Sequence, residues 1–500
     1  MISLLLLVLL AGILLFRYLQ QHYTMFEQDS VPGPKPTMVI GNLAEFANKY
    51  PLDVFVDLTK RFGKVFGYYE GMTPSIVVSD PVVIEKILVK HFHQFDGRPP
   101  CCPFLHGPEY HALPNLNGQP WKQSREIISS AFKTSMIRMM WPRLRTSANR
   151  YINHLEQVQN DNSDGFDIVG NNEAYCLESF ASACFDIDPD SLTSEDMKLL
   201  LLYMRATHNS AAPENTASGL ARTFPSVATF FKLFDADHKK RAMEYFHYIS
   251  QRLHTEKCKM DDSERPTNIL QHFLAARTSS KDHANNTVLT PLSEPVIQGM
   301  TSSLFGGGLG PTAAVLDFTV HCLAVYPDKQ EKLREEVLAV CGDEDMLPMD
   351  VIQSIEYLDM FVNESLRHYT VAPGVARTCS EDCVVSGTQF RKGTVVRLMG
   401  CVQYRDHEVY PDPEKFRPER FSKEERDKRH PYSFIPFGNG PRMCVAKRLG
   451  LLQIKLAVAK LVQRFRVCKS SLTQTPLPVA LRPFLCPKDG VFIRLETREQ

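Results

Sequence analysis

The sequence predicts one large, mainly α-helical domain with a small β part, attached to an N-terminal membrane anchor. Three observations predict this class. Apolar residues recur at helical spacing along much of the chain, a few short segments are rich in β-branched residues, and residues 1–16 form an uninterrupted apolar run. With 500 residues, of which 43% are hydrophobic, the chain has enough apolar material for a large buried core.

The composition argues against two kinds of protein. The formal net charge is +0 at pH 7, so no basic excess points to a nucleic-acid partner. The 13 cysteines are odd in number and show no C-x-x-C spacing, which argues against a disulfide scaffold and a zinc site. A reducing compartment therefore fits this chain better than a secreted state.

The N-terminal run, MISLLLLVLLAGILLF, has no charge before Arg17. Spanning a bilayer takes roughly 20 apolar residues, a length that Tyr18 and Leu19 complete if Arg17 extends its charge to the interface. A cleaved signal peptide is the alternative, but no positive residue precedes the run and no A-x-A site follows it. The expected division of the chain is a membrane anchor over 1–19, a polar and proline-rich hinge over 20–36, and a catalytic domain over 37–500. Positive charges after the run favour a cytosolic position for that domain.

The periodicity of apolar residues predicts the main elements in order. Helices are expected over 51–62, 191–206, 327–340, 351–369 and 444–465. Strands are expected over 75–78, 383–385 and 394–396. Proline and glycine cluster between residues 371 and 421, which predicts a loop-rich region.

The strongest chemical signal is the sequence FGNGPRMC, which ends at Cys444 and precedes the last predicted helix. A thiolate ligand of iron must be deprotonated and shielded, and the start of a helix offers N–H groups that stabilise the anion. Gly440 lets the backbone approach the sulfur and a porphyrin closely, Phe437 can exclude water, and Arg442 can pair with a carboxylate. A buried structural thiol is the alternative role of Cys444.

A second signal is Glu364 followed three residues later by Arg367, about 80 residues before the cysteine. The two share a helix face and can pair, and Arg420 offers a third partner. Burying such a cluster is costly unless all three groups satisfy one another. An exposed ion pair of little consequence is the alternative.

A third signal is Trp121 followed four residues later by Arg125. The two lie on one helix face, and the indole N–H and the guanidinium are both donors suited to a carboxylate. Ordinary amphipathic packing is the alternative.

Together, and in this order, the three motifs resemble the cytochrome P450 superfamily over a stretch from about residue 31 to residue 500. The sequence from Phe416 to Phe465 is most similar to the clan of animal microsomal enzymes that includes drug- and toxin-metabolising members and thromboxane synthase. The resemblance implies the P450 fold, with haem b between a central distal helix and the proximal helix that follows the cysteine loop. It also implies an endoplasmic reticulum membrane protein whose catalytic domain faces the cytosol.

The resemblance assigns roles to individual residues. Cys444 would be the axial thiolate ligand of the haem iron, with Phe437 beside it. The haem propionates would be held by Trp121, Arg125, Arg377 and Arg442, and a structural triad beneath the haem would comprise Glu364, Arg367 and Arg420. Ala446 is a mild departure, because the family usually has glycine there.

The central helix departs more seriously from the family. Its usual pattern, A/G-G-x-acid-Thr-Thr, supplies an acid and an alcohol that organise water and deliver protons over the haem. This chain reads GGGLGPT over 306–312, and an alignment without gaps through Tyr326-Pro327 places Gly310 at the acid, Pro311 at the first Thr and Thr312 at the second. Each glycine costs a helix about 1 kcal/mol and an interior proline about 3 kcal/mol, so we expect the helix to be kinked or opened here.

Three functional classes remain open. The family favours a monooxygenase that takes electrons from NADPH–cytochrome P450 reductase, whose acidic surface Lys447 and Arg448 can meet. An isomerase or lyase of a ready-made lipid peroxide, similar to thromboxane synthase, would need no distal acid or alcohol. A non-catalytic haem carrier is the third class. Apolar side chains such as Phe305, Leu309 and Val371 fall where the family lines its pocket, which suggests a lipophilic substrate, although core packing is usually the better explanation for any one of them.

Overall fold

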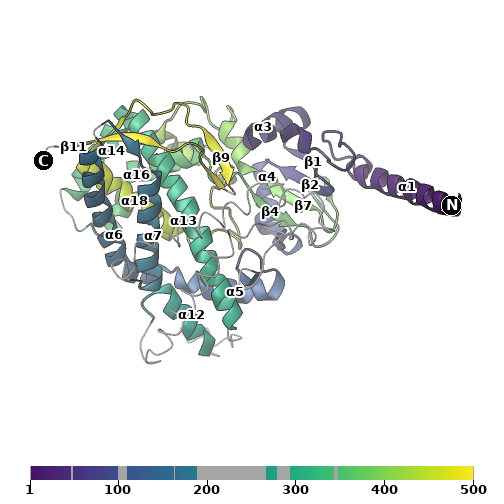
Figure 1. Ribbon diagram of the computed structural model, residues 1–500, viewed down its shortest axis with the longest axis horizontal. Coiled ribbons are helices and arrows are strands. Elements are labelled where there is room, and N and C mark those ends of the chain that lie inside the picture. The colour runs from purple at the N-terminus through teal and green to yellow at the C-terminus, as the bar shows by residue number, and fades with distance from the viewer. Residues whose placement is uncertain are drawn as a thin grey trace.

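The computed structural model describes residues 2–46, 49–99, 110–162, 164–187, 266–278, 293–342, 347–482 and 484–498. The helix predicted over 191–206 lies outside these residues. Within them helices dominate and strands form a smaller part, which confirms the predicted mainly α class (Figure 1).

Long helices fill the half of the molecule that lies away from the N-terminus (Figure 1). The helices that build this half are α5 (Gly118–Ala131), α6 (Thr134–Asp161), α7 (Val169–Phe185), α12 (Ile269–Thr278), α13 (Glu294–Val325), α14 (Pro327–Cys341), α16 (Glu356–His368) and α18 (Lys447–Arg464). The central one, α13, contacts α7, α14, α16 and α18. The helices predicted over 327–340 and 444–465 are confirmed as α14 and α18, and the one over 51–62 is α3 (Pro51–Phe62).

The helix predicted over 351–369 is instead two helices. Ile355, with extended backbone, separates α15 (Met349–Ser354) from α16. The carboxylate of Glu336, on α14, accepts hydrogen bonds from the backbone N–H groups of Glu356 (2.8 Å) and Tyr357 (3.0 Å). The first N–H groups of a helix have no partner within it, so this acid from a neighbouring helix caps α16 and fixes where it begins.

Four strands form a sheet on the side nearer the N-terminus (Figure 1). They are β1 (Val65–Glu70), β2 (Thr73–Val78), β7 (Val395–Leu398) and β4 (Val375–Thr378), in the order β1-β2-β7-β4. β2 and β7 pair in parallel and the other neighbours are antiparallel. The edge strand β4 carries Arg377, so the sheet delivers this side chain to the region of the predicted site.

The other strands form small sheets. They are β3 (Phe166–Asp167) with β11 (Phe492–Thr497) and β8 (Phe465–Lys469), β5 (Cys383–Val385) with β6 (Thr388–Phe390), and β9 (Val479–Arg482) with β10 (Phe484–Pro487). The three predicted strands are found in β2, β5 and β7, although the third is shifted by one residue at its start. Residues 371–421, expected to be loop-rich, hold β4 and β6 besides the predicted β5 and β7. β5 and β6 pair with each other, whereas β7 joins β4 to the distant strand β2, a pairing that local periodicity does not reveal.

The central helix α13 runs unbroken through Pro311, so the expectation that the helix opens there is wrong. Pro311 lacks the N–H that would reach the carbonyl of Gly307, and the hydroxyl of the next residue, Thr312, donates to the carbonyl of Gly308 at 2.5 Å. Packing against neighbouring helices stabilises α13 beyond its poor intrinsic propensity. The helix α13 is long and apolar enough to cross a membrane, but 72% of its most apolar window is buried, as befits a core helix.

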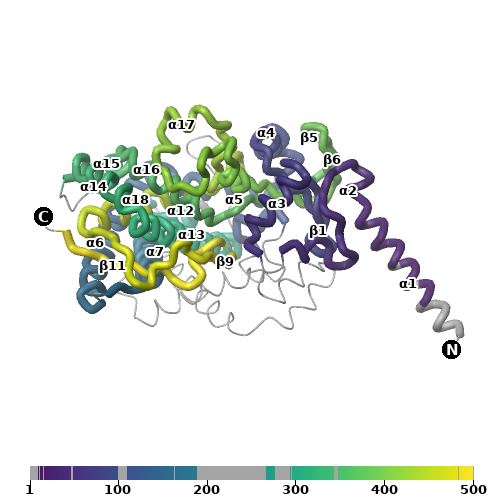
Figure 2. Tube along the Cα trace, turned by 90° about the horizontal axis from the view of Figure 1, so that it is seen from above, coloured from purple at the N-terminus to yellow at the C-terminus, as the bar shows by residue number. Residues whose placement is uncertain are grey.

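The N-terminal helix α1 (Ile2–Tyr23) projects away from the body (Figures 1 and 2). It exposes Leu9, Leu10, Ile13, Leu14 and Phe16.

The end of α1 is fixed to the sheet. The ring of Tyr23 lies 4.9 Å from that of Tyr69, its hydroxyl donates to the carbonyl of Gly71 (3.1 Å), and His22 Nε2 lies 2.6 Å from the carbonyl oxygen of Met72. The polar residues expected to begin a hinge are therefore helical and packed. The extended stretch starts only after α2 (Met25–Gln28), and the division into anchor, hinge and catalytic domain stays a prediction.

Two imidazoles lie in the core beside the ring of Tyr369. His321 on α13 and His368 at the end of α16 have ring centroids 5.7 Å and 5.0 Å from it. Burial lowers the pKa of His321 to about 4, with a smaller contribution from Lys469. Burial and the positive charge of Arg367 lower the pKa of His368 to about 3. Both imidazoles are therefore neutral at pH 7.

These histidines should make the fold sensitive to acid. An unfolded histidine has a pKa of about 6.5, so the unfolded chain binds protons that the folded chain refuses. The stability each contributes is complete above about pH 6.5 and is lost as pH falls toward the folded pKa. The free energy of unfolding should then fall by about 1.4 kcal/mol per pH unit for each imidazole.

The comparison of His321→Phe with the parent protein tests this expectation, with urea unfolding followed by tryptophan fluorescence between about pH 6.5 and about pH 5. The variant should lose stability less steeply by about 1.4 kcal/mol per unit. His154→Phe, which alters an exposed histidine, should behave as the parent does. Equal slopes for the parent and His321→Phe would contradict the assignment of a neutral buried imidazole.

Candidate functional site

Cys444 ends a tight loop between Phe437 and α18. Its backbone N–H donates to the carbonyl of Phe437 at 2.9 Å, and the N–H of Met443 donates to the carbonyl of Gly440 at 3.0 Å. Gly440 has a φ of +73° and packs so closely on the helix Lys86–Lys90 that a Cβ would overlap the carbonyl oxygen of Leu88. The glycine is thus required by contact with this helix, and its expected role in letting the backbone approach the sulfur and a porphyrin stays a prediction.

The thiol of Cys444 lies three residues before α18, facing a cavity of about 490 Å³. Burial raises the pKa of this thiol, whereas the backbone N–H groups of Ala446 and Lys447 and the guanidinium of Arg125 lower it. The net direction is upward, so these groups alone do not hold a thiolate at neutral pH. A coordinated metal ion supplies the additional positive charge that deprotonates such a thiol.

The cavity is built from four segments of chain. Residues of α5 and its C-terminal end, the cysteine loop and α18 supply most of the lining, and α15 adds Gln353. The lining residues are Arg125, Ser129, Phe132, Gln353, Met443, Cys444, Val445, Lys447, Arg448, Leu451, Leu452 and Lys455. Four of them carry a positive charge and none carries a negative charge.

Two predicted propionate ligands are buried cations. Arg377 on β4 is 1% exposed and Arg442 in the cysteine loop is 4% exposed. Nη2 of Arg442 donates to the carbonyl of Leu116 (3.0 Å) and to Oδ1 of Asn117 (3.1 Å), and its guanidinium carbon lies 4.1 Å from the centre of a Trp121 ring. Nη1 of Arg377 donates only to the carbonyl of its neighbour Ala376, at 2.9 Å. Trp121 thus provides a stacking surface for Arg442.

Both arginines have donors that no described residue accepts. Nε of Arg377, and Nε and Nη1 of Arg442, are buried without a hydrogen-bond partner in the described part of the chain. Burial and neighbouring guanidinium groups lower the pKa of Arg377 to about 9 and that of Arg442 to about 10. Such buried, mutually repelling charges are costly without an anion.

Arg98 joins this cluster and was missed by the sequence analysis. Its Nη2 donates to the carbonyl of Arg442 at 3.1 Å, and its charge contributes to the lowered pKa values of Arg377, Arg442 and Arg125. No spacing in the sequence identifies it. The fold brings it in, because the N–H of Thr378 on β4 donates to the carbonyl of Gly97 at 2.9 Å.

The donor set fits haem. The two propionates of haem are carboxylates, and arginine is the side chain best shaped to donate paired hydrogen bonds to a carboxylate. Two conditions for holding this group are therefore met together: a thiol at the start of a helix, and a cluster of cations with unmet donors. Of that cluster only Arg125 also lines the cavity beside the thiol.

The predicted triad is assembled and fully buried. Arg367 Nε and Nη2 donate to the two carboxylate oxygens of Glu364 at 2.7 and 2.8 Å, and Arg420 Nε lies 3.4 Å from Oε1 of the same acid. The remaining donors reach backbone carbonyls, including that of Tyr404 from Arg367 (2.9 Å) and that of Asp412 from Arg420 (2.5 Å). The alternative of an exposed pair is excluded, since Glu364 and Arg367 are 0% exposed.

The distal residues offer no acid–alcohol pair on α13. Gly310 and Pro311 have no polar side chain, and the hydroxyl of Thr312 donates to Gly308 on its own helix. Asp317 lies about two turns further on, where it accepts a hydrogen bond from Asn172 at 2.7 Å. Burial raises the pKa of this acid well above its ordinary value.

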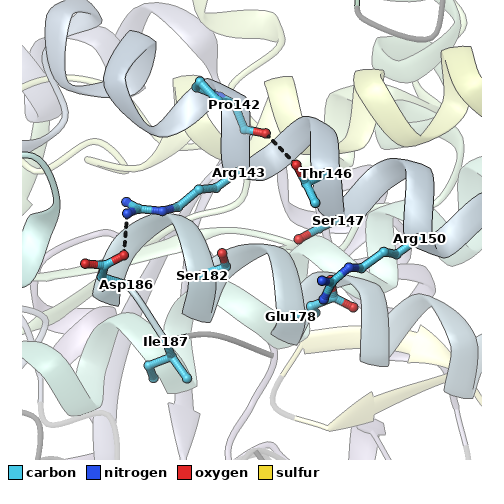
Figure 3. A pocket seen from close by; sticks show the side chains of 9 residues that line it. All are labelled: Pro142, Arg143, Thr146, Ser147, Arg150, Glu178, Ser182, Asp186 and Ile187. Carbon is cyan, nitrogen blue, oxygen red and sulfur yellow. Dashed lines mark hydrogen bonds and ion pairs between the residues drawn. The ribbon is translucent and has the colours of Figure 1, made fainter. Parts of the chain in front are cut away.

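A second cavity, of about 310 Å³, lies between α6 and α7 (Figure 3). Its charged side chains pair across it, Arg143 with Asp186 and Arg150 with Glu178. None of the predicted site residues lines it, so it is not a candidate for the active site.

Comparison with known proteins gives a consistent result. The family model described as Cytochrome P450 matches residues 31–494. Cytochrome P450 3A11 of Mus musculus is 27% identical over 494 residues, covering 97% of this chain and 95% of the relative. Cytochrome P450 3A6 of Oryctolagus cuniculus is 29% identical over 500 residues, covering 98% and 97%. Cytochrome P450 3A12 of Canis lupus familiaris is 29% identical over 504 residues, covering 98% and 96%.

Replacement of Arg377 by methionine should have opposite effects on the two forms of the protein. The haem-free chain loses a buried charge with an unmet donor and should gain about 1–3 kcal/mol in its free energy of unfolding. The same change should weaken haem affinity about tenfold or more, because a charged partner of a propionate is lost. Urea unfolding of the haem-free chain and haem titration measure the two effects. The control variant Arg138→Met, at an exposed ion pair with Asp350, should alter neither the stability nor the haem affinity. If the haem-free Arg377→Met variant were less stable than the haem-free parent, the charge argument would be refuted.

Replacement of Glu364 by glutamine should destabilise the protein with and without haem. The two buried guanidinium groups of the triad would lose their counter-charge, at a cost of about 3–5 kcal/mol. Thermal or urea unfolding of both forms measures this loss. A partly exposed acid supplies the matched control, since Glu419→Gln should cost under about 1 kcal/mol. A loss confined to the haem-bound form would instead indicate a direct role in haem binding.

Proposed function

The chain belongs to the cytochrome P450 family and is a haem-dependent oxidoreductase; on this premise we propose a membrane-anchored monooxygenase that oxidises a lipophilic substrate with dioxygen and electrons from a reductase. The observation that carries the proposal is the Cys444 loop beside the cluster of buried arginines. When bound, haem with a thiolate ligand supplies the chemistry of dioxygen activation. The chain's own residues hold and orient it.

We assign Cys444 as the axial ligand. The N–H groups of Ala446 and Lys447 would stabilise its negative charge, and the loop carbonyl of Phe437 holds its backbone in place. Phe437 would shield the sulfur, with the Lys447 ammonium 5.7 Å from the centre of its ring. Arg98, Arg125, Arg377 and Arg442 would bind the propionates, and Trp121 would fix Arg442 by stacking.

The electron donor would approach the face that carries α18. Lys447 and Arg448 are exposed at the mouth of the cavity that leads to Cys444. Lys455, further along α18, pairs with Asp359 at 2.6 Å and is less available. A positive face this close to the thiolate suits an acidic redox protein, as NADPH–cytochrome P450 reductase would be.

The location would be the endoplasmic reticulum membrane. The apolar side chains exposed along α1 would lie in the bilayer, and the docked end of that helix would set the angle between membrane and body. The catalytic domain would face the cytosol.

Only some of the residues expected to line the substrate pocket support a lipophilic substrate. Phe305 stacks on Phe185 at 4.6 Å and is 2% exposed, so it belongs to the core. The carbonyl of Val371 accepts a hydrogen bond from the N–H of Leu485 at 2.9 Å, which brings the β10 strand to the segment expected to line the pocket. The substrate class therefore rests on the apolar character of these segments and on the family.

A second candidate function rests on the distal residues. Without an acid at Gly310 or an alcohol at Pro311, protons would have to come from water or a substrate hydroxyl. An isomerase or lyase acting on a ready-made lipid peroxide needs no such supply, and its reaction would need neither dioxygen nor a reductase.

One experiment separates the two functions. Purified haem-bound protein is given lipophilic substrates with reductase, NADPH and isotopically labelled dioxygen, and separately lipid hydroperoxides and endoperoxides without reductase. Labelled oxygen in a product that requires NADPH is the expected result. Rapid multiple turnover of a peroxide into rearranged, unlabelled products would overturn the monooxygenase proposal and favour the isomerase.

Restoration of the family's distal groups should raise monooxygenase turnover. A variant carrying Gly310→Glu and Pro311→Thr should increase kcat by about tenfold or more, since a positioned proton donor contributes roughly a hundredfold or more in many enzymes. Gly307→Ala is a matched control, because its added methyl group would enter open space on the same helix. An unchanged or lower kcat in a folded double variant would show that another group already supplies the protons.

A further inference from the structure

Two cysteines face each other across a short loop on the edge of the sheet. Cys379 follows β4 directly and Cys383 opens β5, and their sulfur atoms are 3.8 Å apart. A disulfide has a sulfur–sulfur distance of about 2.0 Å, so closing this gap takes a movement of about 2 Å or less. The family motifs described above include neither residue.

The two cysteines differ in how far their side chains can move. The backbone of Cys379 is fixed in the sheet, where its N–H donates to Thr394 (3.0 Å) and its carbonyl accepts from Gly393 (2.8 Å). Its side chain is 1% exposed and donates to the carbonyl of Glu381 at 2.9 Å. Cys383 is half-buried at the start of the two-stranded β5–β6 hairpin. Cys383 is therefore the thiol that a small oxidant meets first and the side that can move.

The loop is joined to the segment that carries Arg98. The N–H of Ser380 donates to the carbonyl of Gln94 at 2.9 Å, and the Gln94 side chain donates to Glu381 at 3.1 Å. Phe390, which pairs with Cys383 in the hairpin, packs edge-on against Phe95 with ring centroids 5.4 Å apart.

Arg377 lies on β4, two residues before Cys379. A covalent bond across the loop would thus act on the two chain segments that present Arg98 and Arg377 to the predicted propionate site.

We propose that Cys379 and Cys383 form a reversible disulfide on oxidation by a peroxide, and that this bond braces the arginine-bearing segments and slows haem release. The Cys383 thiolate attacks hydrogen peroxide, forms a sulfenic acid and releases hydroxide, which takes up the thiol proton as water. Cys379 then attacks the sulfenic sulfur, the sulfur–sulfur bond forms, and the oxygen leaves as a second water. The two thiols are oxidised by two electrons in total and the peroxide is reduced.

The reaction should be slow near neutral pH. Burial raises the pKa of Cys379 to about 12, with a contribution from Cys383, and burial raises that of Cys383, with contributions from Glu381 and Asp382. Because only a small fraction of either thiol is deprotonated, brief exposure to peroxide should leave the pair reduced, and sustained exposure should oxidise it.

The bond is tested on the haem-bound protein treated with limited hydrogen peroxide, then catalase, then an alkylating reagent and trypsin. The peptide 378–391 contains these two cysteines and no other. In the parent it should be lighter by two hydrogen atoms, resist alkylation, and regain both thiols after reduction. In Cys379→Ser, a sulfenic acid on Cys383 should be trapped by dimedone, whereas Cys383→Ser should leave Cys379 largely reduced. A parent peptide alkylated at both cysteines after oxidation would overturn the proposal.

The brace is tested by haem transfer to apomyoglobin, normalised to the haem absorbance at the start. Oxidised parent protein should release haem about two- to fivefold more slowly than reduced protein, because the cross-link removes open states of the loop. Peroxide should not change the rate in Cys383→Ser, while the control Cys468→Ser, at another partly exposed cysteine, should respond as the parent does. A disulfide with unchanged haem release would overturn the brace.

Discussion

Buried positive charge without a matching negative charge is the constraint on which the rest of this structure depends. Arg377 and Arg442 are almost fully buried, and neither makes an ion pair with a described residue. They come from different elements of the fold, one from the edge of the four-stranded sheet and the other from the cysteine loop. Bringing such cations together lowers the stability of the ligand-free fold, which indicates that the fold binds an anionic ligand. A haem, with its two carboxylates, would supply the negative charge next to the thiol of Cys444.

The triad shows what a charged cluster with its own counter-charge looks like in the same core. Glu364 pairs with both Arg367 and Arg420, and backbone carbonyls accept other donors of the two guanidinium groups. Nε of Arg420 makes no hydrogen bond with a described residue, but it lies 3.4 Å from the Glu364 carboxylate. The contrast separates a structural role from a binding role on physical grounds. The triad is also connected to the arginine cluster through the chain. It fixes α16 and the segment around residue 412, and that segment precedes the cysteine loop that carries Arg442.

Residues joined by short sequence spacing could be predicted, and residues joined by the tertiary fold could not. The loop around Cys444, the Glu364–Arg367 pair and the Trp121–Arg125 pair each lie within a few residues and share one face or turn. Arg98 reaches the same site only because β4 binds the segment before it, and α16 begins at Glu356 only because Glu336 caps it from another helix. The helix α13 stays unbroken at Pro311 because packing outweighs propensity, a balance that the local sequence does not contain.

The spectrum of the reduced protein with carbon monoxide tests the central claim most directly. If Cys444 ligates the haem iron as a thiolate, the Soret band of the complex lies at the long-wavelength position that thiolate ligation produces. The variant Cys444→His, which keeps a ligand for iron, should move the band to the shorter wavelength of histidine-ligated haem. A parent protein that binds haem stoichiometrically, remains folded and yet shows the histidine-like band, or that shows the same spectrum as Cys444→His, would contradict the account.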